Sequence, residues 1–302
     1  MKFGVLTFGY DSFTSFADQL ANHGFYETNL GDNAQSIAIR HIYRHFGVRD
    51  DQMIDINRDA LQQYDGEPAL LLMNGVFYQS AFPLPSAITP VFVGFHAPEH
   101  VIKEQQDFLR KHQPIGCRDE GTTVRMRNLG IEAFTTGCLT LALPRREQEP
   151  KNPKLLIVYG SGAGRLPPIV FRSIPENILS KAELIYHRFH ASRFPFDLEM
   201  RREAELYEEA LFARYRREAT LVLTPLHHVA APCIAFGIPT IICRAGNDVR
   251  FSFVEKLLPI YTPDKFDQIN WNPPAIDVGA VRADLLRVVG NKLIAALHGA
   301  TS

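Results

Sequence analysis

TLVLTPLHHVAAPCIAFGIPTIICR, residues 220–244, is the stretch that decides the fold class. It starts as a buried strand, turns at two histidines, continues as a helix of small residues up to Gly237, and ends as a second buried strand. Two buried strands joined by a helix are typical of a parallel sheet. Open parallel sheets bind ligands at the carboxyl ends of their strands, which is where His227 and His228 fall.

The same alternation continues on both sides of this stretch. Toward the N-terminus it predicts strands at 4–8, 69–75, 91–96 and 131–134, with helices from residue 33, at 97–111 and at 120–128. In the second half it predicts strands at 154–160 and 183–187, a long charged helix over 196–217 and a last helix over 278–298. We therefore expect an α/β protein with two Rossmann-like halves, each built on a parallel sheet.

PRREQEPKNP, residues 144–153, separates the two halves. This stretch is polar and rich in proline, which is the composition of a linker between compact units. A chain of 302 residues also exceeds the usual size of a single hydrophobic core. We predict two domains, residues 1–148 and 149–302, with a cleft between them.

The composition is that of an ordinary globular protein, with 46% hydrophobic and 22% charged residues. The 32 basic residues nearly balance the 33 acidic ones, which argues against a nucleic-acid partner. The sequence contains no apolar run of about 20 residues, the length of a membrane helix, and MKFGVLTFG at its start reads as a strand rather than a signal peptide. Cys117, Cys138, Cys233 and Cys243 are far apart and suit packing thiols in a reducing compartment, so we expect a cytoplasmic protein without a metal or other cofactor.

His227 is the leading catalytic candidate, because an imidazole can act as a general acid or base near neutral pH. His228 is assigned to substrate binding. Alternatively, both histidines only begin the helix and hydrogen-bond to the backbone.

Arg118 is the second catalytic candidate. It follows a short strand in PIGCRDEG, residues 114–121, and its planar guanidinium can clamp a carboxylate or a phosphate. Pairing with Asp119 or Glu120 is the alternative.

NLGDN, residues 29–33, lies between a loop and an amphipathic helix. Gly31 permits a close approach of the backbone, Asp32 is expected to cap the helix, and the free amides of the first turn can hold an anion or a sugar hydroxyl. Capping without ligand contact is equally compatible with the sequence. The predicted substrate-binding residues of the first half are Asn29, Gly31, Asp32, Asn33, Asn74 and His96.

Three more polar segments follow predicted strands. GSGAGR, residues 160–165, lacks the spacing of a dinucleotide or P-loop motif, so it is either a plain tight loop or a loop whose amides touch a phosphate. RAGNDVRFSF, residues 244–253, is either a solvated loop or a source of cleft residues, with Arg244 and Arg250 assigned to substrate binding. The remaining candidates for the cleft wall are Asn247, Asp248, His187, Arg188, His190 and Arg193.

Together these segments resemble the polysaccharide pyruvyl transferase family in their order and approximate spacing. NLGDNAQSIA is similar to the N-terminal NxGD element of that family. PIGCRDEGTTVRMRNLGIEAFTTGCLTLAL is similar to its arginine-bearing segment, which ends in a TGC-type turn, and LVLTPLHHVAAPCIAFGIPTII to its C-terminal signature. RFSFVEKLLPIY continues as in a subgroup of the family, so the resemblance spans residues 28–265.

The resemblance implies a fold similar to that of the GT-B glycosyltransferases. It also implies the catalytic activity of the family. Family members transfer the pyruvyl group of phosphoenolpyruvate onto two hydroxyls of a sugar, forming a cyclic ketal. His227 would then be the acid or base, and Arg118, Arg250 and Arg244 would bind the carboxylate and phosphate of the donor. Residues 1–148 would hold the sugar or glycan acceptor, and residues 149–302 would hold the donor.

Two positions depart from the family pattern. Pro225 stands where an arginine usually precedes Leu-His, and His228 replaces a small residue, while His227 is kept. Another arginine substitutes, the substrate differs, or activity has been lost. Two other functions therefore stay open, a GT-B-type glycosyltransferase using a nucleotide sugar and a non-catalytic carbohydrate-binding relative.

Overall fold

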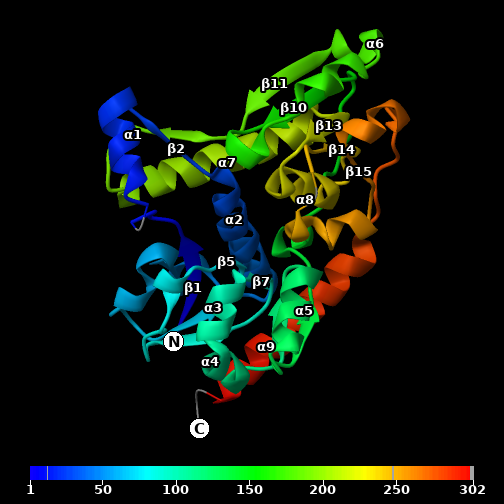
Figure 1. Ribbon diagram of the computed structural model, residues 1–302. Helices are drawn as coiled ribbons and strands as arrows, with labels where there is room; N and C mark the ends of the chain where they lie inside the picture. Colours follow the sequence, from blue (N-terminus) through cyan, green and yellow to red (C-terminus); the bar gives the residue numbers. More distant parts are fainter. Residues whose placement is uncertain (12, 247, 300–302) are drawn as a thin grey trace.

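The first half of the chain forms parallel strands in the order β3-β1-β4-β6, continued by β5-β7-β8-β9. The computed structural model describes residues 1–11, 13–246 and 248–299 (Figure 1). The strands are β1 (Lys2–Thr7), β3 (Met53–Asn57), β4 (Ala69–Leu72), β5 (Gly75–Val76), β6 (Ile88–Val91), β7 (Phe95–His96), β8 (Ile115–Cys117) and β9 (Ala133–Thr135).

These two sets of strands continue one another. The N–H of Met73 donates to the carbonyl of Val91 and the N–H of Gly75 to that of Gly94, both at 2.9 Å, so β4 runs into β5 and β6 into β7. The first half is therefore one parallel surface with a kink, in which β1 lies between β3 and β4.

The second half repeats this arrangement. Its five-stranded sheet has the order β11-β10-β13-β14-β15, and all neighbours pair in parallel. The strands are β10 (Leu155–Tyr159), β11 (Ala182–Tyr186), β13 (Leu221–Thr224), β14 (Thr240–Cys243) and β15 (Ile260–Tyr261). The predicted α/β class with two Rossmann-like, parallel-stranded halves is confirmed, and the arrangement is consistent with a GT-B-like protein.

Helices cover the sheets, and most lie where the apolar periodicity predicts them. They are α1 (Ser15–His23), α2 (Leu30–His45), α3 (Glu99–Glu104), α4 (Gln106–Lys111), α5 (Glu120–Asn128), α6 (Glu176–Leu179), α7 (Leu198–Glu218), α8 (His227–Ala235) and α9 (Gly279–Gly299). The helix predicted at 97–111 is interrupted at Gln105. The helix predicted at 120–128 is confirmed, and Asp119 caps it by accepting the N–H of Thr122 at 2.8 Å.

The predicted cap of α2 is wrong. The helix begins at Leu30, and its cap is Asn29, whose side-chain oxygen accepts the N–H of Gly31 at 3.3 Å. Asp32 lies inside the first turn instead. Asn29 satisfies the first amides of the helix, which leaves the carboxylate of Asp32 available for other contacts.

The two halves are interwoven. The short strand β2 (Tyr26–Thr28) pairs antiparallel with β12 (Phe189–Ala191) of the second half, and α2 packs against α7 and α8. Helix α9 returns to the first half, where it contacts β6 and the turn η4 (Leu139–Ala142) (Figure 1). Residues 144–153 contain neither helix nor strand. The domain boundary at residues 148 and 149 stays a prediction.

The hydrophobic core runs through the contact between the halves. One cluster of buried side chains includes Leu30 and Ala34 of α2 together with Phe196 and Met200 near the start of α7. Burial of apolar surface therefore holds the two sheets in a fixed relation, which a site between them requires. The four cysteines are buried free thiols, as predicted.

No described helix is both long enough and apolar enough to cross a membrane.

Candidate active site

Two adjacent chambers, which share wall residues, lie between the carboxyl ends of the two sheets. The N-terminal chamber has a volume of about 250 Å³ and the C-terminal chamber about 150 Å³. Residues of both halves line them, and the chambers share Asn29, Arg118, Arg188, His228 and Arg250. The strand order of each sheet reverses next to β1 and β10, and open α/β sheets bind their ligands at such points.

The polar wall of both chambers consists largely of residues that follow strands. They are Tyr10 after β1, Asn29 after β2, Arg58 after β3, Tyr78 after β5, Arg118 after β8, Ser161 after β10, Arg188 after β11, His227 after β13 and Arg244 after β14. The parallel topology therefore gathers side chains that are distant in the sequence.

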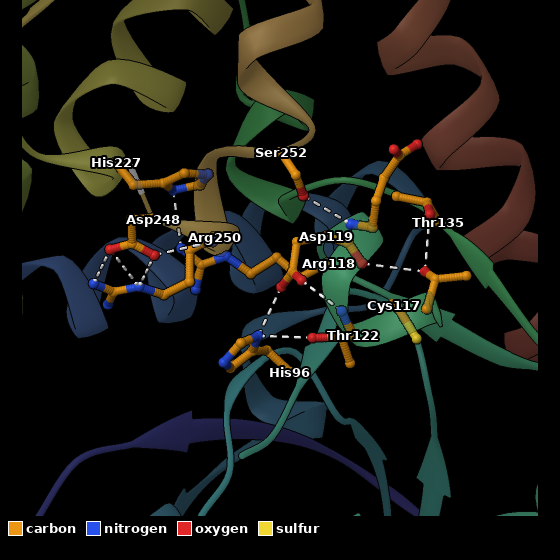
Figure 2. Close-up of polar contacts among 12 residues, drawn as sticks. His96, Cys117, Arg118, Asp119, Thr122, Thr135, His227, Asp248, Arg250 and Ser252 are labelled. Carbon is orange, nitrogen blue, oxygen red and sulfur yellow. Dashed lines mark hydrogen bonds and ion pairs between the residues drawn. The ribbon is translucent and has the colours of Figure 1, made fainter. Parts of the chain in front are cut away.

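Arg118 of the first half meets His227 of the second half in the C-terminal chamber (Figure 2). Nη2 of Arg118 lies 2.9 Å from Nδ1 of His227, and both side chains are buried. A guanidinium only donates hydrogen bonds, so Nδ1 accepts and the ring proton resides on Nε2. Burial and the charge of Arg118 hold the pKa of His227 well below its usual value of 6.5. The imidazole is therefore neutral in the free protein.

Arg118 has no carboxylate partner among the described residues. Oδ2 of its neighbour Asp119 lies 2.7 Å from Nδ1 of His96 (Figure 2). Glu120 pairs with Lys256. Nε of Arg118 is buried and has no hydrogen-bond partner. A buried guanidinium with an unused donor is a group that an anionic ligand would satisfy.

Four arginines line the C-terminal chamber, and no carboxylate is among its described wall residues. The carboxylate of Asp248 pairs with Arg250 at 2.6 Å and with Arg244 at 3.2 Å. Burial alone would raise the pKa of Asp248, but its pairing with Arg250 lowers that pKa to about 2. One carboxylate cannot neutralise four guanidiniums, so the chamber has an excess of positive charge that favours a small anion.

Arg244 stands next to Pro225, one of the two positions that depart from the family pattern. Its Nη1 donates to the carbonyl oxygen of Pro225, and its guanidinium lies 4.3 Å from the ring centroid of Phe251. The chamber therefore has a guanidinium beside Pro225, although the side chain at position 225 carries no charge.

Arg188 bridges the two halves. Its Nη1 donates to Oδ1 of Asn29 at 3.1 Å and its Nε donates to Oγ of Ser161 at 3.0 Å. The other members of the predicted cluster do not line the chambers, because His187 is buried against Glu208 while His190 and Arg193 are exposed. Asn247 lies outside the described residues.

Two carboxylates line the N-terminal chamber, Glu27, which accepts a hydrogen bond from the hydroxyl of Tyr186 at 2.7 Å, and Asp32. Tyr10 donates its hydroxyl to Oδ2 of Asp32 at 3.1 Å, and Nη1 of Arg58 lies 3.9 Å from the same oxygen. Burial raises the pKa of Asp32, although the charge of Arg58 opposes that shift. Sequence reasoning did not select Tyr10 or Arg58. The position of Tyr10 just after the predicted strand at 4–8 was a usable signal, but the short strand before Arg58 was not predicted.

The close fit of Gly31 against His228 joins the two halves at the chambers. A Cβ atom on Gly31 would lie 1.9 Å from Cγ of His228, so only glycine lets the imidazole pack on the backbone of α2. Burial, together with the neighbouring His187 and Arg188, holds the pKa of His228 well below 6.5. Like His227, His228 is neutral in the free protein.

Sequence comparison identifies the family. The family described as Polysaccharide pyruvyl transferase matches residues 29–247. The chain belongs to this family. The match includes NLGDN, the segment around Arg118 and the stretch containing His227.

Comparisons of this pyruvyl transferase family member with curated proteins and with solved structures do not narrow its function further. It matches none of the curated proteins in sequence. It is similar to a crystal structure of a functionally uncharacterized protein from Klebsiella pneumoniae subsp. pneumoniae, with 11% sequence identity over 83% of this chain and 88% of that chain and a TM-score of 0.46.

Most of the predicted site residues of this pyruvyl transferase family member are brought together. Those lining the chambers are His227, Arg118, Asn29, Gly31, Asp32, His228, Arg244 and Arg250. Asn33, Asn74 and His96 do not line them: Asn33 is buried within α2, Asn74 donates to Gln35, and His96 contacts Asp119. No three His, Cys, Asp or Glu side chains gather as metal ligands among the described residues.

Proposed function

We propose that this protein transfers the pyruvyl group of phosphoenolpyruvate onto a sugar of a polysaccharide or glycan precursor and forms a ketal. The contact of Arg118 with His227, in a chamber lined by four arginines, is the observation that carries this proposal. It joins an anion-binding group to an acid or base across the two halves. The C-terminal chamber, at about 150 Å³, is small compared with the roughly 300–1,000 Å³ of drug-sized ligand pockets, which favours phosphoenolpyruvate over a nucleotide sugar as its occupant.

The C-terminal chamber is the proposed donor site. Phosphoenolpyruvate carries a carboxylate and a phosphate, and their desolvation must be offset by cationic groups and N–H donors. Arg118, Arg188, Arg244 and Arg250 supply the cationic groups. Arg244, which contacts Pro225, takes the place of the arginine that the family pattern has at position 225. The loop at 160–165 adds Ala163 and Gly164 to the wall, but the N–H of Gly164 is already donated to the carbonyl oxygen of Ser161.

The proposed reaction converts the enol carbons of the donor into the methyl group and the ketal carbon of the product. The methylene carbon of the donor gains a proton, and an acceptor hydroxyl attacks the adjacent carbon. The bond from that carbon to the phosphate oxygen breaks, and a second hydroxyl closes the ring. The two hydroxyls lose two protons, of which one is retained on the new methyl group and one leaves on hydrogen phosphate.

His227 is the proposed acid. In the free protein its Nδ1 is occupied by Arg118, which prevents protonation there. A bound dianion would draw the guanidinium toward itself and raise the pKa of the imidazole. Donor binding would thus free Nδ1 and let His227 take up the proton that it then delivers, so that the acid is charged only when the substrate is present.

Asp32 is the proposed base, and the N-terminal chamber is the proposed acceptor site. Its carboxylate faces that chamber with a raised pKa, so it is better matched to accepting a hydroxyl proton than an ordinary aspartate. Asn29 and Tyr10 offer further hydrogen bonds to sugar hydroxyls. Residues 1–148 would then serve the acceptor and residues 149–302 the donor, and four reduced cysteines suit action in the cytoplasm.

Donor specificity tests the proposal. Wild-type protein would be heated with phosphoenolpyruvate or with each of several nucleotide sugars, and the unfolding temperature would be measured. A ligand at 100 times its Kd stabilises the folded state by about 2.7 kcal/mol, which gives a clear shift. We expect a shift with phosphoenolpyruvate. No shift at millimolar phosphoenolpyruvate would contradict the proposal, and a shift with a nucleotide sugar alone would identify a glycosyltransferase.

Turnover tests the role of His227. Phosphate release from phosphoenolpyruvate in the presence of pooled cell glycans would be compared between wild type and His227→Ala. Loss of a general acid typically lowers the rate by about 10²–10⁴-fold. Wild-type turnover by the variant would rule out the proposed acid.

A further inference from the structure

Arg250 reaches the chambers from a segment of the second half that packs against the first half. Residues 248–256 are part of the connection between β14 and β15 of the second sheet and contain the turns η7 (Val249–Phe251) and η8 (Val254–Lys256). Turn η7 contacts helix α5 of the first half. The guanidinium of Arg250 is bound by Asp248 of the same segment. Its position in the chambers therefore depends on where the segment lies on α5.

Three contacts fix the segment to the start of α5. Oγ of Ser252 accepts the N–H of Glu120 at 2.9 Å, which satisfies one of the free amides of the first turn (Figure 2). The ammonium of Lys256 pairs with the carboxylate of Glu120. Val249 lies against Gly121, where a Cβ atom would come within 1.9 Å of Cγ2 of the valine.

The contact between Val249 and Gly121 specifies where the segment lies on α5. Exposed ion pairs such as Lys256 with Glu120 contribute little to stability. Packed carbon atoms sit about 3.5–4.0 Å apart, so a methyl group on Gly121 would displace Cγ2 of Val249 by more than 1 Å and would also press on its Cβ atom, which lies 3.3 Å away. Arg250 is the next residue in the chain. A displacement of this size is enough to misplace a group that must meet a ligand.

We propose that residues 248–256 form a clasp that holds Arg250 in the donor site by closing on α5, and that Gly121 is the residue that lets the clasp close. The inference rests on the proposed function, since it assigns Arg250 to the donor anion. Gly121, Val249 and Ser252 are positioning residues, because they act on the ligand only through Arg250. The clasp makes the donor site dependent on contact between the two halves.

The test is the substitution Gly121→Ala with a rescue by Val249→Ala. Binding of phosphoenolpyruvate and of inorganic phosphate would be measured by calorimetry on the full chain. Loss of one hydrogen bond from a charged group lowers affinity by about 10-fold to 100-fold, and we expect Gly121→Ala to do so. The double variant removes the methyl group that the new Cβ would strike, so its affinity should return to within about threefold of wild type. Gly299→Ala is the control, since no atom of the described residues lies within 4 Å of where its Cβ would be.

Hydrogen exchange tests whether the clasp closes, independently of donor binding. Amides of residues 249–253 would be followed in the ligand-free full chain, where opening of the clasp accelerates their exchange. We expect faster exchange in Gly121→Ala and wild-type exchange in the double variant. Unchanged exchange in Gly121→Ala, or a double variant as impaired as the single one, would overturn the clasp. If wild type bound neither anion, the proposed donor site would be wrong, and the exchange data alone would decide whether the clasp closes.

Discussion

Replacing Arg118 by glutamine tests the physical basis of the proposed donor site. The substitution removes a buried positive charge that no described carboxylate neutralises, and it leaves a side chain that still donates a hydrogen bond. We expect two opposite effects. Anion binding should weaken strongly, while the free protein should be no less stable than wild type, because an unpaired buried charge is costly to fold.

The size of the binding effect follows from the geometry. Two unit charges about 4 Å apart interact by about 4 kcal/mol at an effective dielectric constant of 20. Truncation of one partner of a buried, hydrogen-bonded charge pair costs about 2–5 kcal/mol in binding measurements. We expect a loss of about 2–4 kcal/mol, which corresponds to a Kd for phosphoenolpyruvate raised about 30-fold to 900-fold.

Calorimetry at fixed ionic strength measures this Kd, and thermal unfolding without ligand measures stability. Arg193→Gln is the matched control, because Arg193 lies outside the chambers with 54% of its side chain exposed. Such a surface change should alter the binding free energy by no more than about 0.5 kcal/mol. Arg118→Gln protein that binds phosphoenolpyruvate within threefold of wild type would refute the reasoning. So would a large drop in Tm, which would make Arg118 a structural residue.

Three further predictions concern the other groups of the site and its support. Asp32→Asn should lower kcat by about 10²–10⁴-fold with an unchanged Kd for phosphoenolpyruvate, and an unchanged kcat would exclude Asp32 as the base. The folded-state pKa values of His227 and His228 lie below 6.5, so the unfolded chain binds more protons there as pH falls below 6.5. The free energy of unfolding in urea should therefore fall from pH 6.5 to pH 5 by up to about 1.4 kcal/mol per pH unit for each histidine, and a double His→Gln variant that keeps the full slope would contradict this. Glu208→Ala should cost about 2–5 kcal/mol of stability, because truncation of this fully buried side chain leaves a cavity beside His187, and a loss under 1 kcal/mol in urea unfolding would show that the surrounding core closes over it.

The sequence by itself determined most elements of the fold, although not α1, β2 and β3. Apolar runs such as LLIVY, at 155–159, and LVLT, at 221–224, form strands wherever they can be buried on both faces. The start and end of α5 were also predictable, because Asp119 caps the helix and Gly130 follows it with a φ of +69°. These signals are local, since a strand or a helix terminus depends on a few neighbouring residues.

The sequence also selected most of the site for a topological reason. Side chains that follow the strands of a parallel sheet collect at one edge, and this rule singled out Arg118, His227 and Arg244. It failed where a strand was too short or too polar to predict, as with the strand before Arg58. It also placed Asp32 at the cap of α2, because an asparagine and an aspartate three residues apart are both good caps.

Only the tertiary structure decided which of these groups touch. The bond from Arg118 to His227 joins residues 109 positions apart, and the fit of Gly31 to His228 crosses the same interface. Neither contact has a local signature, because each depends on how the apolar faces of α2, α7 and α8 pack the two sheets together. Residue type and strand order can predict that polar groups approach one edge. The distances that give those groups a function come from the packing of the core.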